Sequence, residues 1–162
     1  MENNKKIGVF LCQCDGRIDP WVDLKELQDK LEKNPRISRV DILPMSCTAP
    51  GMSRVKAIVT ENGLDRLVIA GCESRILLKK FNQEFLGTNI QEGQIDMVNL
   101  RDHVASVHKL SPQEMAFKAA KLVGAAAAGL EVLQPTISEK VEFVGPVMIL
   151  GGALPPMRPL RN

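Results

Sequence analysis

Four short apolar segments alternate along the chain with segments whose apolar residues recur every three or four positions. The apolar segments are residues 7–12, 40–43, 67–72 and 95–100. A nearly continuous apolar run of this length is typical of a strand that is buried on both faces of a parallel sheet. We therefore predict four strands with a helix between each pair.

Helix start and stop signals fall in the intervening segments. Asp19 and Pro20 predict the start of the first helix, whose Leu24, Leu27 and Leu31 share one face. Pro50 predicts the start of the second helix and Gly63 its end. A third helix is predicted from residue 74 to about residue 87.

The most strongly signalled helix begins at Ser111, where Ser-Pro-Gln-Glu combines a capping-box pattern with proline at the first helical position. This alanine-rich helix is predicted to run to about residue 133, followed by a linker (134–140) and a last strand (141–150). The alternation predicts an α/β three-layer sandwich, with a doubly wound, mostly parallel sheet of four to five strands and helices on both faces. We expect one α/β domain over residues 1–134. Residues 135–162 would hold a linker, a strand, and either the incomplete start of a nucleotide-binding unit or a disordered tail.

Composition and charge narrow the classes of function. The chain has 162 residues, with 21 Lys and Arg against 19 Asp and Glu, so no charge excess indicates nucleic-acid binding or a membrane surface. The first apolar run is too short for a signal-peptide core or a transmembrane helix. We expect a cytoplasmic protein without membrane insertion, whose four cysteines stay reduced.

The four cysteines all fall where predicted strands end. Cys12 ends the first strand and Cys14 follows it, Cys47 comes after the second strand, and Cys72 ends the third. In an open α/β sheet these carboxyl ends share one edge, where ligands bind. Cys12 and Cys14 would point the same way if the chain stays extended, and Cys47 and Cys72 would complete a shell of four thiolates.

Other interpretations of the cysteines stay open. Free cysteine is often simply buried, and Cys12 and Cys72 each finish an apolar run. Structural zinc accepts four cysteines, although its usual sites use two closely spaced pairs. A thioredoxin-like role fits less well, because Cys12 and Cys14 form Cys-x-Cys rather than Cys-x-x-Cys. A small α/β enzyme or nucleotide-binding module would need a phosphate-binding loop after the first strand, and residues 13–17 supply none.

The motifs around these cysteines resemble the N-terminal domain of the iron–sulfur flavoproteins that form the A-type subunits of heterodisulfide reductase. The resemblance rests on Ile-Gly-Val-Phe-Leu-Cys-Gln-Cys-Asp-Gly (7–16), Ser-Cys-Thr-Ala-Pro-Gly (46–51), Ala-Gly-Cys-Glu-Ser-Arg (70–75) and Asn-Leu-Arg-Asp-His through Val-His (99–108). Asp15 is an additional residue in the Cys-x-Cys-Gly pattern. Many relatives also carry Cys-Ser-Trp where this chain has Val104, Ala105 and Ser106.

The resemblance implies an electron-transfer module that carries a [4Fe-4S] cluster on Cys12, Cys14, Cys47 and Cys72. It would be a component of an oxidoreductase complex rather than a complete enzyme, with flavoprotein, ferredoxin, hydrogenase or formate dehydrogenase type partners. The alternative is a zinc-stapled or metal-free interaction domain that docks a larger redox assembly. Residues expected to surround and tune the site are Gly16, Gly51, Arg75, Arg101, His103 and His108.

In the family a FAD-binding unit follows this domain, and residues 145–152 resemble its first strand and glycine-rich turn. The motif then fails, because Ala153 to Pro156 supply no third glycine and Pro159 opposes a continuing helix. We expect FAD to bind only to a full-length relative. We also expect this chain to be truncated, frame-disrupted or a stand-alone version.

Overall fold

The computed structural model describes residues 5–85, 87–91, 93–135, 144–146 and 148. Strands and helices alternate along the described chain up to the fourth strand, which is followed by a π-helical turn and a long α-helix. The elements are β1 (Ile7–Cys12), α1 (Leu24–Leu31), β2 (Ile37–Leu43), α2 (Ala49–Asn62), β3 (Arg66–Gly71), α3 (Ser74–Glu84), β4 (Ile95–Asn99), the π-helical turn η1 (Arg101–Ala105) and α4 (Pro112–Val132).

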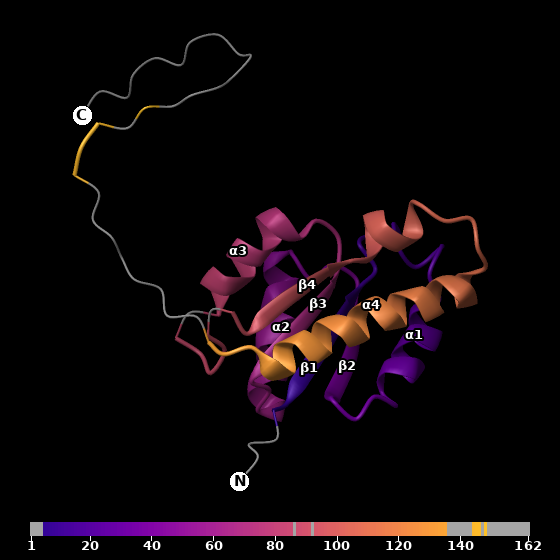
Figure 1. Cartoon of the computed structure of the whole chain (residues 1–162), viewed down its shortest axis with the longest axis horizontal. Helices are drawn as coiled ribbons and strands as arrows, with labels where there is room; N and C mark the ends of the chain where they lie inside the picture. Colours follow the sequence, from indigo (N-terminus) through magenta and orange to yellow (C-terminus); the bar gives the residue numbers. More distant parts are fainter. Residues whose placement is uncertain (1–4, 86, 92, 136–143, 147, 149–162) are drawn as a thin grey trace.

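The four strands form one sheet in the order β2-β1-β3-β4, and every neighbouring pair is parallel. The predicted class is therefore confirmed, with four strands among the described residues. Since the strands are parallel, their carboxyl ends meet at a single edge of the sheet (Figure 1). The loops that leave this edge precede α1, α2, α3 and η1.

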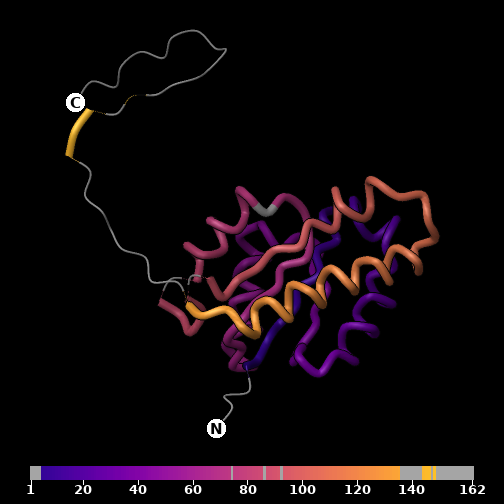
Figure 2. The backbone as a smooth tube through the Cα atoms, in the orientation of Figure 1, coloured from indigo at the N-terminus to yellow at the C-terminus, as the bar shows by residue number. Residues whose placement is uncertain are grey.

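Helices cover both faces of the sheet, and each face has its own apolar core. One core joins β1, β2 and β3 to α1 and α4, and the other joins the opposite faces of the strands to α2 and α3. In β1, Val9 and Leu11 point into the first core and Phe10 into the second, as the two-residue period of a strand requires. The tube trace shows α4 crossing the sheet beside α1 (Figure 2).

The prediction of the first helix was right about the buried leucines and wrong about its start. The helix begins at Leu24, and its N-cap is Asp23, whose side chain accepts a hydrogen bond from the Glu26 N–H. Residues 16–22 form turns instead, and these turns bury Ile18 and Val22 completely. Burial of these two side chains outweighs the local signal of Asp19 and Pro20.

Most other element boundaries agree with the sequence to within a few residues. Gly63 ends α2 in the left-handed conformation, and the N-cap of α3 is Glu73 rather than Ser74. For the predicted last strand, the described positions Val144, Gly145, Pro146 and Met148 are not in a strand, and the remaining positions lie outside the described residues. The predicted domain boundary at residue 134 stays a prediction.

Helix α4 is held at both ends by side chains. Ser111 and Glu114 form the predicted capping box at its start. Near its end, the buried Arg66 of β3 donates a hydrogen bond of 2.8 Å from Nε to the Leu130 carbonyl, which is one of the last four carbonyls of the helix. Asp65 lies 3.3 Å from the Arg66 Nη1 and balances its charge.

Replacing Arg66 with methionine is expected to lower the free energy of unfolding by about 1–3 kcal/mol, because the Leu130 carbonyl would lose its donor in a buried place. The matched control is Arg36→Met, which removes the ion pair of Arg36 with Glu131 at the same helix end, where both side chains are about half exposed. An exposed pair is worth roughly 0–1 kcal/mol. Urea unfolding of both variants measures the difference, and equal losses would contradict the role given to Arg66.

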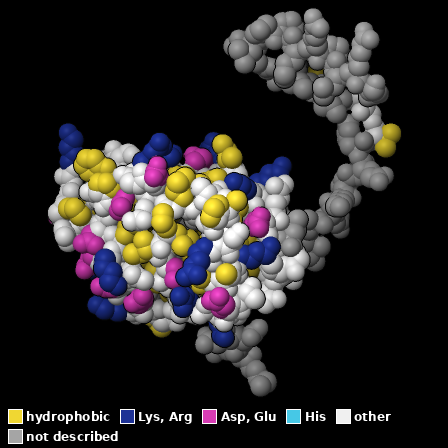
Figure 3. All heavy atoms as spheres, turned by 180° about the vertical axis from the view of Figure 1, so that it is seen from behind, with side chains coloured by type: hydrophobic (Ala, Val, Ile, Leu, Met, Phe, Trp, Pro, Cys, Tyr) yellow, Lys and Arg dark blue, Asp and Glu magenta, His cyan; other side chains and the backbone are white. Residues whose placement is uncertain are grey.

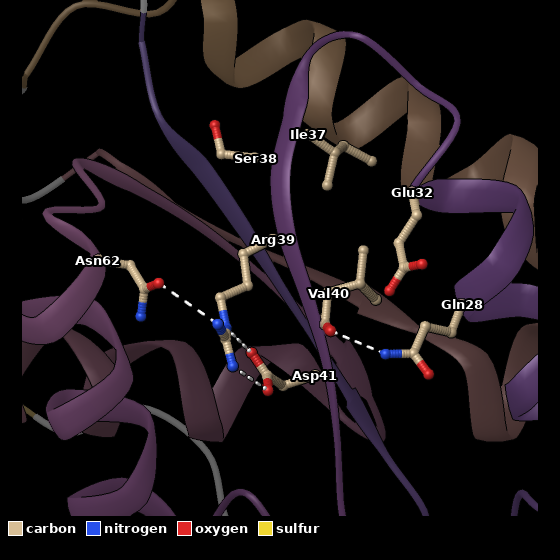
Figure 4. A pocket seen from close by; sticks show the side chains of 8 residues that line it. All are labelled: Gln28, Glu32, Ile37, Ser38, Arg39, Val40, Asp41 and Asn62. Atoms are coloured by element: carbon tan, nitrogen blue, oxygen red, sulfur yellow. Dashed lines mark hydrogen bonds and ion pairs between the residues drawn. The ribbon is translucent and has the colours of Figure 1, made fainter.

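A groove of about 490 Å³ follows the free edge of β2, between α1 and the end of α2. Gln28 and Glu32 line one side of the strand, and Arg39, Asp41 and Asn62 line the other (Figure 4). Gln28 donates a hydrogen bond of 2.9 Å to the outward-facing carbonyl of Val40, and Arg39 pairs with Asp41 at 2.6 Å. Polar and charged side chains thus occupy the edge, which is a common protection of edge strands against pairing with other chains.

The surface on the side opposite α4 mixes hydrophobic, basic and acidic side chains (Figure 3). Apolar atoms gather near the middle of this face, and both signs of charge are interspersed around them (Figure 3). Among the helices of the described residues, none combines the length and the apolar character that crossing a membrane requires.

Candidate metal centre

All four cysteines lie at the carboxyl edge of the sheet, and all four are free thiols. Cys12 is the last residue of β1, the central strand that separates β2 from β3. Cys72 directly follows β3, and Cys47 directly precedes Thr48, the N-cap of α2. Cys14 lies in the turn that leaves β1. Three adjacent strands therefore bring the four cysteines to the same edge of the sheet.

The sulfur of Cys12 accepts hydrogen bonds from two backbone groups. The donors are the N–H of Cys14 at 3.3 Å and the N–H of Ser46 at 3.4 Å. The Cys14 sulfur lies 3.6 Å away, within range of an S–H···S hydrogen bond. These donors favour negative charge on the Cys12 sulfur, and they act against the burial of that side chain, which disfavours it.

Cys14 does not continue the extended strand, contrary to the geometry predicted for Cys-x-Cys. Cys14, Asp15 and Gly16 have successive φ angles of 53°, 55° and 75°, all in the left-handed region. That region costs a non-glycine residue about 1 kcal/mol or more, and such strain concentrates at functional sites. The turn, rather than the strand period, brings the Cys14 sulfur beside Cys12.

Gly71 forms a wall of the site that lacks a side chain. A Cβ atom built there would lie 3.8 Å from the Cys12 sulfur and 3.9 Å from the Cys14 sulfur. Both sulfurs therefore face the end of β3, where the next residue is Cys72. The charge of Cys72 also raises the pKa of Cys14, after the larger effects of Cys12 and of burial.

Cys47 approaches the group from the loop between β2 and α2. Burial raises the pKa of the Cys47 thiol, and the charges of Cys72 and Cys12 raise it further. The electrostatic influence of these two cysteines indicates that Cys47 shares their neighbourhood. All four cysteines thus lie at the predicted edge of the sheet, and their joint role as ligands of one group stays a prediction.

Cys12 and Cys14 share a proton unequally. The hydrogen bond from Cys14 is the largest influence holding the pKa of Cys12 at about 5, against an ordinary value of 9.0; burial opposes it, and the N–H groups of Ser46 and Cys14 assist. The pKa of Cys14 is raised far above its ordinary range, chiefly by the same hydrogen bond and by burial. The folded, metal-free pair therefore holds one thiolate near neutral pH.

This pair predicts a pH dependence of stability in the metal-free protein. The pKa of Cys12 falls from 9.0 in the unfolded chain to about 5 in the fold, so the unfolded chain binds more protons between these values, and stability rises with pH across that window. The contribution is lost as the pH falls through 5. The raised pKa of Cys14 does not change how stability depends on pH below 9, because Cys14 is protonated there in both the folded and the unfolded chain.

The measurement is anaerobic urea unfolding of metal-free protein at about pH 6 and about pH 8, where the Cys12 contribution changes by at most about 1.4 kcal/mol per pH unit. Cys12→Ser removes the depressed thiol and is expected to flatten the slope. If wild type and Cys12→Ser give parallel pH dependences, the shared-proton interpretation is wrong.

Lys80 of α3 also contacts the site, and no motif in the sequence predicted it. Its Nζ donates a hydrogen bond of 2.8 Å to the backbone carbonyl of Cys47. The two residues are 33 positions apart, so no local pattern connects them. Only the packing of α3 beside the loop between β2 and α2 brings them together.

Arg101 lies at the same edge in the π-helical turn after β4. Asp102 accepts hydrogen bonds of 2.9 and 3.1 Å from its guanidinium, and the buried Asn99 donates one of 2.9 Å to the same carboxylate. Asn99 pairs in register with Gly71, the residue before Cys72. The hydrogen bond with Asp102 is the largest cause of the raised pKa of Arg101, and Cys72 and Cys14 add to it.

The other residues predicted around the site have different roles. Arg75 is exposed in the first turn of α3, and His103 is exposed in the turn after β4. The ring of His108 contacts the Lys118 ammonium. Gly16 has no neighbour that a Cβ would meet, so its left-handed φ is what the turn requires of it. Gly51 faces the Met45 carbonyl, and its expected place around the site stays a prediction.

Val104 and Ala105, at the position of Cys-Ser-Trp in the resembled family, are buried in the core that includes α4. Of the described residues, no three His, Cys, Asp or Glu side chains form a ready-made site for a single metal ion. The four thiols nevertheless share one edge of the sheet, together with backbone donors at Cys12 and two nearby cations, Lys80 and Arg101.

No protein-family model matches the chain. The fold and the site together define a parallel α/β domain that gathers free thiols at the carboxyl ends of three adjacent strands. Three similar proteins each align with almost the whole length of this chain.

The first is one of the A-type iron-sulfur subunits of CoB–CoM heterodisulfide reductase from Methanopyrus kandleri, which is 29% identical over 153 residues, or 94% of this chain and 23% of the relative. The A-type subunit of the ferredoxin:CoB-CoM heterodisulfide reductase of Methanosarcina acetivorans is 32% identical, over 92% of this chain and 18% of the relative. The corresponding subunit of the H(2)/formate:CoB-CoM heterodisulfide,ferredoxin reductase of Methanococcus maripaludis is 26% identical, over 94% and 23%.

The homologues of this chain are thus A-type subunits of heterodisulfide reductase, as the sequence motifs predicted. The chain spans less than a quarter of the length of these relatives.

Proposed function

We propose that the chain is an electron-transfer module that binds one [4Fe-4S] cluster through Cys12, Cys14, Cys47 and Cys72. The observation that carries this proposal is the delivery of four free thiols to one sheet edge by three adjacent strands. Cubane clusters are held by four cysteine thiolates. The iron-sulfur name of the Methanopyrus relative supports the same class of cofactor.

The residues present fit such a group in three respects. The donor set is entirely sulfur, two backbone N–H groups already point at the Cys12 sulfur, and Gly71 leaves the wall beside Cys12 and Cys14 free of a side chain. Hydrogen bonds to cluster sulfurs and close backbone approach are the usual protein contributions to reduction potential. When bound, the group would supply one-electron chemistry, while this chain holds it and shields it.

The proposed context is a heterodisulfide reductase-like oxidoreductase complex, in which the chain is a component rather than a complete enzyme. The names of the relatives include ferredoxin, H(2) and formate as reaction partners of the whole proteins. We propose partners of the flavoprotein, ferredoxin, hydrogenase or formate dehydrogenase type. FAD is assigned to a full-length relative and not to this chain.

A zinc-stapled interaction domain is the second candidate. One observation favours it: the sulfurs of Cys12 and Cys14 are 3.6 Å apart, close to the roughly 3.8 Å between two thiolates of a tetrahedral zinc site with Zn–S bonds of about 2.3 Å.

Anaerobic purification followed by iron, sulfide and zinc analysis separates the two candidates. We expect about four iron and about four sulfide per chain, with broad visible absorption that bleaches on reduction with dithionite. One zinc per chain and no sulfide would favour the zinc site. A colourless protein that also resists reconstitution with iron and sulfide would exclude the cluster.

A further inference from the structure

Lys80 reaches from α3 to the loop that carries Cys47, and the sequence pattern gives it no role in the fold. Its ammonium donates a hydrogen bond of 2.8 Å to the Cys47 carbonyl, so a positive charge contacts the backbone of a candidate ligand. The Lys80 side chain is exposed at the surface of α3. The contact restricts the side chain of Lys80, which costs conformational entropy, and it buries no apolar surface. Its contribution to the stability of the fold is therefore small.

Lys80 does not form an ion pair with the nearest acidic residue of its own helix. Glu84 lies four positions further on, where an ion pair with Lys80 would form, but its carboxylate is 3.8 Å from Lys56 of α2 instead. The ammonium lies 2.8 Å from the backbone carbonyl oxygen of Cys47 itself, so its charge is held beside this candidate ligand.

We propose that Lys80 is a positioning residue that raises the reduction potential of the four-cysteine site, an inference that rests on the function proposed above. One electron passed from a reduced protein carrier to the oxidised, loaded site adds one negative charge near the ammonium. The ammonium therefore stabilises the reduced form more than the oxidised form. The hydrogen bond to the Cys47 carbonyl holds the loop where the field acts.

The test is the reduction potential of cluster-loaded Lys80→Met, measured anaerobically by dithionite titration with mediator dyes. At a fixed potential near the midpoint, the ratio of reduced to oxidised protein is expected to fall about threefold to tenfold, and a tenfold change corresponds to about 59 mV for one electron. Lys80→Arg keeps the charge and is expected to retain the wild-type potential. Lys79→Met is the matched control, because Lys79 is the exposed neighbour on the same helix.

Ionic strength distinguishes the charge from a structural effect. The difference between wild type and Lys80→Met is expected to shrink as salt is raised, because the Debye length falls from about 10 Å at 0.1 M to about 3 Å at 1 M. A difference that is independent of salt would assign Lys80 a purely structural role. If Lys80→Met fails to bind the cluster, Lys80→Gln retains a donor for Cys47 and carries the same expected shift.

The outcomes separate this inference from the proposed function. Wild-type protein that binds no iron and sulfide would overturn both. Loaded wild type and loaded Lys80→Met with equal potentials, or an equal shift in Lys79→Met, would overturn the role of Lys80 and leave the cluster proposal standing.

Discussion

Replacing Gly51 with alanine is expected to lower the free energy of unfolding by about 3–5 kcal/mol, which is large for one methyl group. A Cβ at Gly51 would collide with the Met45 carbonyl oxygen and would lie 3.0 Å from the Ser46 Cα. Both obstacles are backbone, so no rotamer change relieves them. The first turn of α2 would have to move away from the loop that carries Cys47.

Urea or thermal unfolding measures this effect, and Gly129→Ala provides the matched control. Gly129 lies in α4 with no atom within 4 Å of its built Cβ. The same substitution there is expected to stabilise the protein by about 0.5–1 kcal/mol through helix propensity. A Gly51→Ala protein with wild-type stability would mean that the backbone of the loop before α2 can move away from the new methyl group at little cost in free energy.

Cys72→Ser is expected to abolish cluster binding, with loss of most iron, sulfide and visible absorption. A serine hydroxyl replaces one of the four thiolates that a cubane requires. Cys72 is the informative choice because it lies just after β3 and is only partly buried, whereas Cys12 is buried at the end of the central strand. The fold should therefore survive the change, which circular dichroism can verify.

The control for Cys72→Ser is Val107→Ser, which places a serine in the exposed loop after η1 without removing a thiol. We expect Val107→Ser to take up wild-type amounts of iron and sulfide on anaerobic reconstitution. Full iron and sulfide in a folded Cys72→Ser protein would remove Cys72 from the ligand set. The proposal would then need a fourth ligand from elsewhere on the edge.

The strands and the edge where the cysteines meet were predictable because both depend on long, unambiguous patterns. A strand buried on both faces needs apolar residues at nearly every position, and β1 and β3 have them. Once strands alternate with helices, right-handed crossovers place all the carboxyl ends together. The approximate location of Cys12, Cys47 and Cys72 follows from this topology without knowledge of any side-chain contact.

The start of the first helix was not predictable, because two aspartates compete as its cap. Asp19 precedes a proline, which is the stronger local signal, yet Asp23 is the cap. The choice between the two caps is determined by Ile18 and Val22. These side chains are buried because the chain turns through residues 16–22 before the helix begins. Burial in a tertiary core cannot be read from the cap residues alone.

The details of the site were the least accessible from the sequence. Cys-x-Cys predicts two thiols on one side of an extended strand, but the structure turns left-handed at Cys14 and through the additional Asp15. Lys80 reaches Cys47 only because α3 packs beside the loop before α2. Neither feature has a local pattern that distinguishes it from an ordinary turn or a solvated helical lysine.

Because the thiols come from separate loops, a group that binds all of them would also restrict the unfolded chain. A group held by all four sulfurs would join Cys14 to Cys47 and Cys47 to Cys72, closing loops of about 33 and about 25 residues in the unfolded chain, each worth about 3–4 kcal/mol in the chain-entropy treatment of cross-links. The occupied centre would thus act as a staple. Its loss would then shorten the lifetime of the folded protein as well as ending its chemistry.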